Sequence, residues 1–287
     1  MKFVSKANLE LFAALLKKQG GSSKASEIDT ESATAGQLLG TDGSGNTEWE
    51  SPMTDDDVDM MFIEKGTILK MNLDGTERQY RVIKKVGGSV FEVMGLFNAK
   101  TGIQLKYNTT STTTTFADGT TGQKYTDSDA DTFYNTTWYG NLSADAKAAI
   151  VDKNIIQDMW YRANNGNPIY VGIYGTNSQY NVSLKAGATL TVGDRHVYAP
   201  SMQDFIDYFE VTPQMTYQNT TLSEANIRSF LGTTDNISFW TRSAIAGFTD
   251  YVMYMGVSKF SSQNATSTAA AYPAFQIDLS KITYTEV

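Results

Sequence analysis

Few residues in this sequence have the types and spacing that could do chemistry. There is no cysteine, and His196 is the only histidine. The lack of cysteine excludes thiolate nucleophiles and Cys-based zinc sites. Asp194 and Arg195 lie beside His196, but the members of a Ser-His-Asp triad are brought together by the fold and not by sequence. We therefore interpret His196 as a structural or surface residue and predict no catalytic residue.

A second candidate for chemistry is the alternating aspartate run Asp127, Asp129 and Asp131, which has the spacing that begins a calcium-binding EF-hand loop. The sixth position of such a loop would be Thr132, where glycine is needed, and the twelfth would be Trp138, where a bidentate glutamate is needed. This excludes an EF-hand, while a looser calcium or sodium site stays an open alternative. We predict no metal and no cofactor.

Two stretches place aromatic rings beside asparagine and arginine, residues 134–139 and residues 159–167. Flat rings beside amide donors are what sugars and protein loops bind. Predicting loops here, we take these as candidate ligand-binding residues: Trp138, Tyr139, Trp160, Tyr161, Arg162, Asn164 and Asn165. The alternative is that the same rings lie in the core or in a trimer interface.

Composition limits the classes of partner. The net charge is -8, which disfavours binding to nucleic acid or to anionic headgroups because both depend on Lys and Arg. No run approaches about 18 consecutive apolar residues, so no membrane span is expected. Charged residues are 19% and aromatic residues 12% of the chain. The surface must therefore rely on Ser, Thr, Asn and Gln, as in virion and extracellular adhesive proteins.

The elements that would position these groups begin with a helix predicted over residues 6–19, capped by Ser5 and stopped at Gly20. It is apolar over most of its girth, and an isolated helix of this length is marginal in water. We expect self-association or docking into a larger particle, with packing onto its own domain as the alternative. The candidate oligomerisation residues here are Val4, Leu9, Leu11, Phe12, Leu15 and Leu16.

A connector rich in Ser, Thr and Gly follows over residues 22–51. Its turn cluster at residues 41–46 predicts a small hairpin that contains Leu38, Leu39 and Trp49, three further candidate oligomerisation residues. A single hairpin is not stable alone. Three copies side by side could bury these residues together.

From residue 62 onward the pattern predicts one α+β domain with short, turn-punctuated antiparallel strands. Strands are expected over 67–72, 80–86, 89–97, 251–257 and 275–279, and helices over 142–153, 201–209 and 222–232, with Ser143 and Ser201 as caps. Trp240 is expected in the core, and Arg242 is expected to bind loop carbonyls or a carboxylate such as Asp278.

The N-terminal helix together with the segment Thr34-Ala-Gly-Gln-Leu-Leu-Gly-Thr-Asp-Gly-Ser-Gly-Asn-Thr-Glu-Trp49 resembles the start of head-fibre and tail-fibre proteins of gut bacteriophages, of the crAss-like type. The match covers about a sixth of the chain. It implies a virion protein, made in the host cytoplasm and carried on the particle surface, that forms homotrimers. Its N-terminal region would bind capsid or other virion proteins.

The block from Tyr125 to Ile282 resembles a domain family of unknown function in phage structural proteins and gut bacterial surface proteins, related in fold to C-type lectins and formylglycine-generating enzymes. The match includes Val197-Tyr-Ala-Pro-Ser-Met-Gln-Asp-Phe, Phe239-Trp-Thr-Arg-Ser-Ala and Ala271-Tyr-Pro-Ala-Phe-Gln-Ile-Asp-Leu-Ser. It implies a C-type-lectin-like fold. The thiols of the enzyme family and the calcium loop of the lectins are absent, so catalysis and calcium-dependent sugar binding are not implied.

Together these observations predict three parts: an anchoring and oligomerising helix (1–20), a stem and linker (21–61) and a C-type-lectin-like domain (62–287). The predicted function is a trimeric head fibre that mediates adhesion to glycans of the host surface or of mucus and is not an enzyme. The alternatives are a tail or collar fibre component, with or without receptor activity, and a fibre-borne glycan depolymerase.

Overall fold

The computed structural model of the chain describes residues 38–41, 47–50, 60, 62–99, 105–110, 112–164, 167–168, 182–210, 224–233, 235, 237–256 and 259–287. The chain divides into two units, residues 1–58 and residues 59–287. The helix predicted over 6–19 lies outside the described residues, and so do its candidate oligomerisation residues Val4, Leu9, Leu11, Phe12, Leu15 and Leu16.

The first unit contains the hairpin that the connector sequence predicts. Strand β1 (Leu38–Thr41) pairs antiparallel with strand β2 (Thr47–Glu50). In this register Leu39 lies opposite Trp49, and Leu38 lies opposite Glu50. The Gly- and Asn-rich segment between the strands supplies the residue types that favour a turn. The predicted hairpin is confirmed.

The second unit is a mixed α+β structure, mostly strands in antiparallel or mixed sheets with a few short helices. The strands of its first sheet are β3 (Ile68–Asn72), β4 (Glu77–Gly87), β5 (Val90–Gly95), β9 (Ile150–Val151), β17 (Ala274–Asp278) and β18 (Tyr284–Glu286). They lie in the order β18-β3-β4-β5-β17-β9, and every neighbouring pair is antiparallel. The first and last strands of the unit are therefore partners.

The second sheet is built on one long strand. Its members are β10 (Lys153–Asn164), β11 (Asn167–Pro168), β12 (Val182–Arg195), β13 (Ser238–Ile245), β14 (Tyr251–Gly256) and β15 (Lys259–Asn264). The order is β11-β10-β13-β14-β15, and β12 also pairs with β10. The β10 and β13 pair is parallel, with Met159 opposite Ala244, so this sheet is mixed.

Two short ribbons and the helices complete the unit. Strand β6 (Leu105–Lys106) pairs with β16 (Thr268–Ala269), and β7 (Thr113–Thr115) pairs with β8 (Thr121–Gln123). The helices are α3 (Asp129–Thr132), the π-helix η2 (Phe133–Trp138), α4 (Ala144–Ala149), α5 (Met202–Phe209), α6 (Glu224–Leu231) and the 3-10 helix η3 (Leu279–Lys281).

Local capping explains where two of the helices begin. Ser143 accepts a hydrogen bond from the amide of Ala146 at the start of α4, at 3.1 Å. At α5, Ser201 and Asp204 form a reciprocal capping box. Helix α4 is shorter than the predicted 142–153, because Ile150 turns to extended backbone and pairs with Ile277 of β17. The tertiary pairing overrides the helical tendency of the segment.

The burial pattern along β4 and one tight turn explain how the first sheet begins. Tyr80 and Val82 are both fully buried, two residues apart on β4, as a half-buried strand requires. The turn between β3 and β4 includes Gly75 at φ +87°, a conformation that favours glycine. Asp74 accepts a hydrogen bond from the amide of Thr76 in the same turn. The strands predicted at 67–72 and 80–86 are thereby confirmed as β3 and part of β4.

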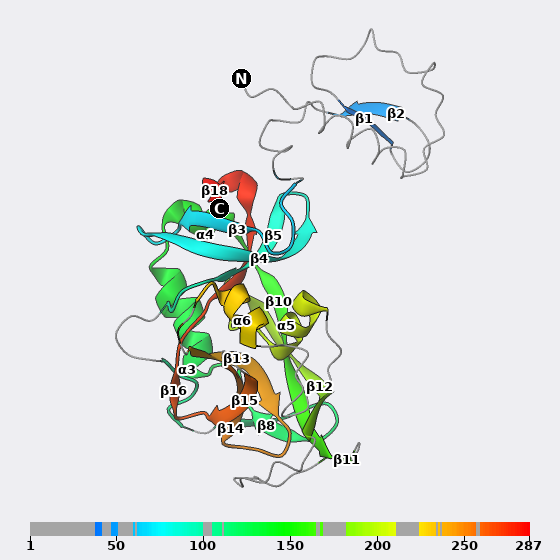
Figure 1. Cartoon of the computed structure of the whole chain (residues 1–287), viewed down its shortest axis with the longest axis vertical. Coiled ribbons are helices and arrows are strands. Elements are labelled where there is room, and N and C mark those ends of the chain that lie inside the picture. The colour runs from blue at the N-terminus through cyan, green and yellow to red at the C-terminus, as the bar shows by residue number, and fades with distance from the viewer. Residues whose placement is uncertain are drawn as a thin grey trace. The chain divides into compact units, whose positions relative to one another are not determined.

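Two apolar clusters form most of the core. One contains Phe275 of β17 and extends back to Met60, so the second unit begins before the predicted boundary at residue 62. The other joins Ile83 of β4 to Phe205 of α5 and Phe239 of β13, and so connects the two sheets through a helix. Within this unit β3 and β18 lie at one end, β11 and β14 at the other, and α5 and α6 in the middle (Figure 1).

Candidate functional site

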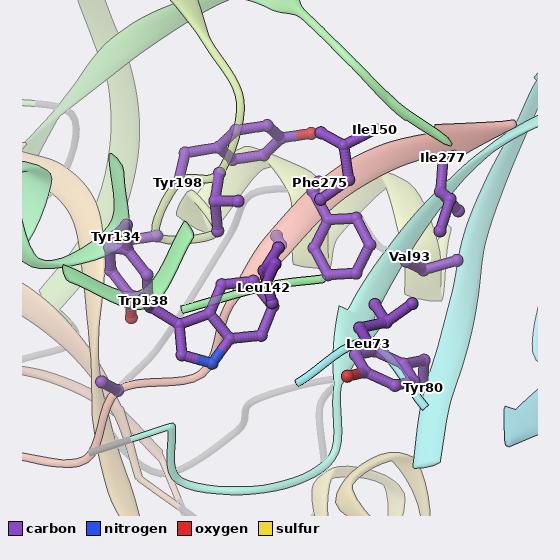
Figure 2. Close-up of a cluster of buried hydrophobic side chains, with 14 of the residues drawn as sticks. Leu73, Tyr80, Val93, Tyr134, Trp138, Leu142, Ile150, Tyr198, Phe275 and Ile277 are labelled. Atoms are coloured by element: carbon purple, nitrogen blue, oxygen red, sulfur yellow. The ribbon is translucent and has the colours of Figure 1, made fainter. Parts of the chain in front are cut away.

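The two tryptophans among the candidate ligand-binding residues lie in the core. Trp138 is 5% exposed, with its ring centroid 5.8 Å from that of Phe275, and Figure 2 shows both rings inside the cluster. Trp160 is fully buried, and its indole nitrogen donates to Asp158 at 2.7 Å. The prediction that they face a ligand is wrong, because burying such large apolar surface stabilises the fold more than display does. The open alternative, a core position, is correct for both.

The predicted loop at residues 159–167 is largely a strand. Tyr161, Arg162 and Asn164 continue β10, and they lie opposite Lys185, Leu184 and Val182 of β12. Asn165 lies outside the described residues. The asparagine-rich composition suggests a loop, but pairing with a 14-residue partner strand holds the segment extended.

Arg242, on β13, is the centre of a buried polar network. Its Nη1 lies 2.7 Å from Oδ2 of Asp204 and donates to the carbonyl of Ala199, while its Nε donates to the carbonyl of Ile156 at 2.7 Å. The predicted structural role is confirmed, but the predicted carboxylate is wrong. Asp278 instead binds Ser89, Ser280 and Lys281.

The same network fixes the charges of its members. Burial opposes ionisation of Asp204 and Arg242, yet their attraction outweighs it, lowering the pKa of Asp204 and raising that of Arg242. Asp158 accepts from Ser243 at 2.5 Å and from Trp160, and burial raises its pKa despite Arg242. Every one of these groups is committed to protein partners, so the network organises the fold and offers no reactive group to solvent.

The alternating aspartates are also committed to the protein. Asp131 forms a bidentate ion pair with Arg195, at 2.8 and 2.9 Å. It also accepts a hydrogen bond from the side-chain amide of Asn135. Asp129 accepts from Thr109, and Asp127 pairs with Lys124. These bonds use both carboxylate oxygens of Asp131 and one oxygen each of Asp127 and Asp129. The open alternative of a looser calcium or sodium site therefore gains no support.

A group of four side chains that are partly or fully exposed lies elsewhere on the unit, and we call it the Tyr139–His196 cluster: Tyr139, Lys147, Asp152 and His196. The rings of Tyr139 and His196 are stacked, with centroids 4.1 Å apart and an interplanar angle of 11°. Nδ1 of His196 pairs with Oδ1 of Asp152, and these two side chains are 41% and 52% exposed. Lys147 places its Nζ 5.8 Å from the centroid of the Tyr139 ring.

Four separate elements deliver this cluster. Tyr139 follows directly on the π-helix η2, and such helices occur frequently at functional sites. Lys147 is on α4 and donates to the carbonyl of Gly140 at 2.7 Å. Asp152 lies between β9 and β10, and His196 follows the end of β12. The side-chain oxygen of Asn135 accepts from the backbone amide of His196 at 3.2 Å.

The cluster combines a pair of stacked rings with a carboxylate and an ammonium group. Nδ1 of His196 and Oδ1 of Asp152 form their pairing, while Nε2 and Oδ2 form no hydrogen bond with a described residue. Burial, and then the charge of Asp152, raise the pKa of Tyr139, so its hydroxyl stays a neutral donor. A stacked, oriented imidazole beside a carboxylate offers a flat face with hydrogen-bonding groups at its edge.

The sequence predicts a binding role for Tyr139 but gives no such indication for Lys147 or Asp152. Tyr139 is a predicted ligand-binding residue, and His196, interpreted as a structural or surface residue, has a side chain that is 41% exposed. Lys147 and Asp152 carry no local signal, because each becomes part of the site only when α4 and the turn before β10 are placed beside η2. The spacing of residues along the sequence does not predict contacts between segments this far apart.

Among the described residues, no three acidic or histidine side chains gather as a metal site would need. None of the helices in the described part of the chain is both long and apolar enough to cross a bilayer. Compared with known proteins, the chain matches no protein-family model, no curated protein and no solved structure.

Proposed function

We propose that this protein is a virion structural protein, a trimeric bacteriophage head fibre that binds glycans of the host surface or of mucus and is not an enzyme. The observation that carries the proposal is the β1–β2 hairpin, with Leu39 opposite Trp49. It lies in the Gly-rich segment on which the resemblance to phage fibres rests. Two strands of four residues are marginal alone in water, so this hairpin needs apolar partners outside itself.

Three copies of the chain supply such partners. Side by side, three hairpins could shield their Leu and Trp residues from water, which is how a thin fibre stem is stabilised. The helix expected over residues 6–19 would then be the part that binds the capsid or another virion protein. The number three follows from the resemblance to phage fibres, which are usually trimeric.

The second unit is the part that we propose faces the receptor. We propose that it is C-type-lectin-like, which is supported by its mixed α+β composition and by the pairing of its first strand β3 with its last strand β18. The chain enters the unit beside β3, at one end, while β11 and β14 form the other end (Figure 1). An attachment at the first end leaves the remaining surface accessible to a receptor.

The depolymerase alternative has less support. Asp158 and Asp204, two acids of the same network around Arg242, are both hydrogen-bonded to protein donors. A glycosidase needs a general acid and a second carboxylate that face the substrate. The exposed Tyr139–His196 cluster offers one carboxylate and an imidazole, which favours binding.

The experiment is to purify the particles and test for the protein by mass spectrometry and by electron microscopy with an antibody against residues 59–287. We expect the chain on the head surface, in copy numbers divisible by three. Absence from the particle would contradict the proposal, and labelling confined to the tail would replace head fibre by tail fibre. Release of sugar from purified host polysaccharide would replace adhesion by depolymerisation.

A further inference from the structure

The Tyr139–His196 cluster allows the ligand to be specified more closely. We propose that it is a binding site for a neutral pyranose, with the imidazole of His196 as the stacking surface and Asp152 as the acceptor of ligand hydroxyl groups. This inference rests on the proposed function, because it names the site and the ligand class that adhesion would use.

The stacking surface follows from the geometry of the two rings. Tyr139 lies parallel to His196 at 4.1 Å, so one face of the imidazole is covered by protein. The His196 side chain is nevertheless 41% exposed, so part of the imidazole is accessible to a ligand. One face of a pyranose is made of C–H groups that carry slight positive charge, and these pack favourably on the negative face of an aromatic ring.

The edge of this surface carries the groups that a sugar would bind through its hydroxyls. Asp152 uses Oδ1 for Nδ1 of His196, and its Oδ2 has no partner among the described residues. Nε2 of His196 and the Tyr139 hydroxyl are likewise without a described hydrogen-bond partner. Neighbouring hydroxyls on a sugar ring both donate and accept, so one ligand could bind both Nε2 and Oδ2.

The surface is held in place before any ligand arrives. Asn135 accepts from the backbone amides of His196 and Val197, at 3.2 and 3.3 Å. Asn135 in turn donates to Asp131, whose ion pair with Arg195 fixes the residue before His196. Binding therefore does not have to order these groups, which lowers the entropic cost of association.

The charges at the site favour a neutral ligand. The carboxylate of Asp152 is next to the stacking surface, and Lys147, of opposite charge, lies across the ring of Tyr139. An acidic sugar stacked on His196 would be repelled by the Asp152 carboxylate that pairs with this imidazole. A neutral pyranose meets no such repulsion and gains the hydrogen bond to Oδ2.

The test is saturation-transfer NMR on the full chain with the methyl glycosides of galactose, glucose, mannose and N-acetylglucosamine, and with a methyl sialoside as the acidic probe. We expect at least one neutral glycoside to bind, and its C–H face to receive the strongest transfer. His196→Ala and Asp152→Asn should each weaken binding about tenfold, the loss of one stacking or charged contact. Phe62→Ala removes a side chain of similar exposure, 42%, outside the cluster and should leave binding unchanged.

Three results would overturn the inference: no neutral glycoside binds the wild-type chain, binding survives His196→Ala at full strength, or only the sialoside binds. Circular dichroism and the unfolding midpoint of each variant show whether a loss reflects the site or the fold. If His196→Ala unfolds the chain, Asp152→Asn decides the outcome. None of these results bears on presence in the particle, so a failure here is distinguishable from a failure of the proposed fibre role.

Discussion

Arg242 and Asp204 form an ion pair inside the second unit, with Nη1 2.7 Å from Oδ2 and only 3% of the arginine side chain exposed. The pair joins β13 to the first turn of α5, and the same guanidinium binds carbonyls of two further segments. One side chain thus fixes the relation between the second sheet and the helix that packs on it.

We predict that Arg242→Met lowers the free energy of unfolding by about 3 to 5 kcal/mol, because Asp204 loses its ion-pair partner and keeps only the capping bond from Ser201. Arg242→Lys should recover only part of this, since an ammonium cannot reproduce the fork of donors. Urea unfolding followed by tryptophan fluorescence measures both. Lys124→Met breaks a surface pair with Asp127 and should cost less than about 1 kcal/mol. Similar losses for the two methionine variants would contradict this prediction.

Ser143 is expected to contribute through its side chain alone. Its hydroxyl accepts from Ala146 at the start of α4, and replacing a capping serine by alanine costs about 1 kcal/mol. Ser143→Asp keeps an acceptor at the cap and adds a favourable charge near the helix dipole, so it should retain wild-type stability. The unfolding midpoint in urea compares the two variants. Equal destabilisation by alanine and aspartate would show that the cap does not stabilise α4.

Asp278 should make the protein sensitive to acid. Burial raises its pKa, but hydrogen bonds from Ser89 and Ser280 and the ammonium of Lys281 outweigh this and lower the pKa to about 2. The folded pKa is below the unfolded value of about 3.9. Its contribution, on the order of 1 to 2 kcal/mol, is therefore complete above about pH 5 and is lost as the pH falls toward 2.

The measurement for Asp278 is the free energy of unfolding between pH 2 and pH 7. Asp278→Asn keeps an oxygen for both serines but cannot titrate, so its curve should fall less steeply in acid than that of the wild type. Asp118→Asn, on the exposed turn before β8, provides a control. Parallel curves for wild type and Asp278→Asn would rule out this source of acid sensitivity.

The hairpin of the first unit predicts a dependence of assembly on Leu39. Leu39→Asp places a charge opposite Trp49 and removes apolar surface worth about 1.5 to 3 kcal/mol in each copy. The proposed trimer should then dissociate at a concentration at least tenfold higher. Analytical ultracentrifugation of the full chain measures this, with Glu48→Gln, opposite Gly40, as the control. A wild-type chain that remains monomeric at every concentration would contradict the stem proposal.

Local signals in the sequence predicted more than long-range ones. The cap at Ser201 and the turn at Gly75 are read from neighbours within four residues, and the structure contains both. The partner of Arg242 is 38 residues away on another element, and no spacing distinguishes Asp204 from Asp278. The burial of Trp160 is equally hard to predict, because the residues around it in the sequence do not indicate which face of β10 packs on the core.

The Tyr139–His196 cluster illustrates that limit at a site. Tyr139 is predicted as a binding residue only because its segment places aromatic rings beside polar residues. Its stacking on His196 depends on bringing residues 57 positions apart into contact, through the ion pair of Asp131 with Arg195. Pairing of charged side chains across such separations is a property of the folded chain.

The pairing of β3 with β18 makes the second unit a portable module. Glu286 lies opposite Leu69, and the amide of Val287 donates to the carbonyl of Ile68 at 3.0 Å, so the last strand ends beside the start of the first. A module of this form can be inserted into a surface loop of another protein, or have its ends joined and new ends opened elsewhere, without pulling its sheet apart. Such a transfer would need no change to the strands inside the unit.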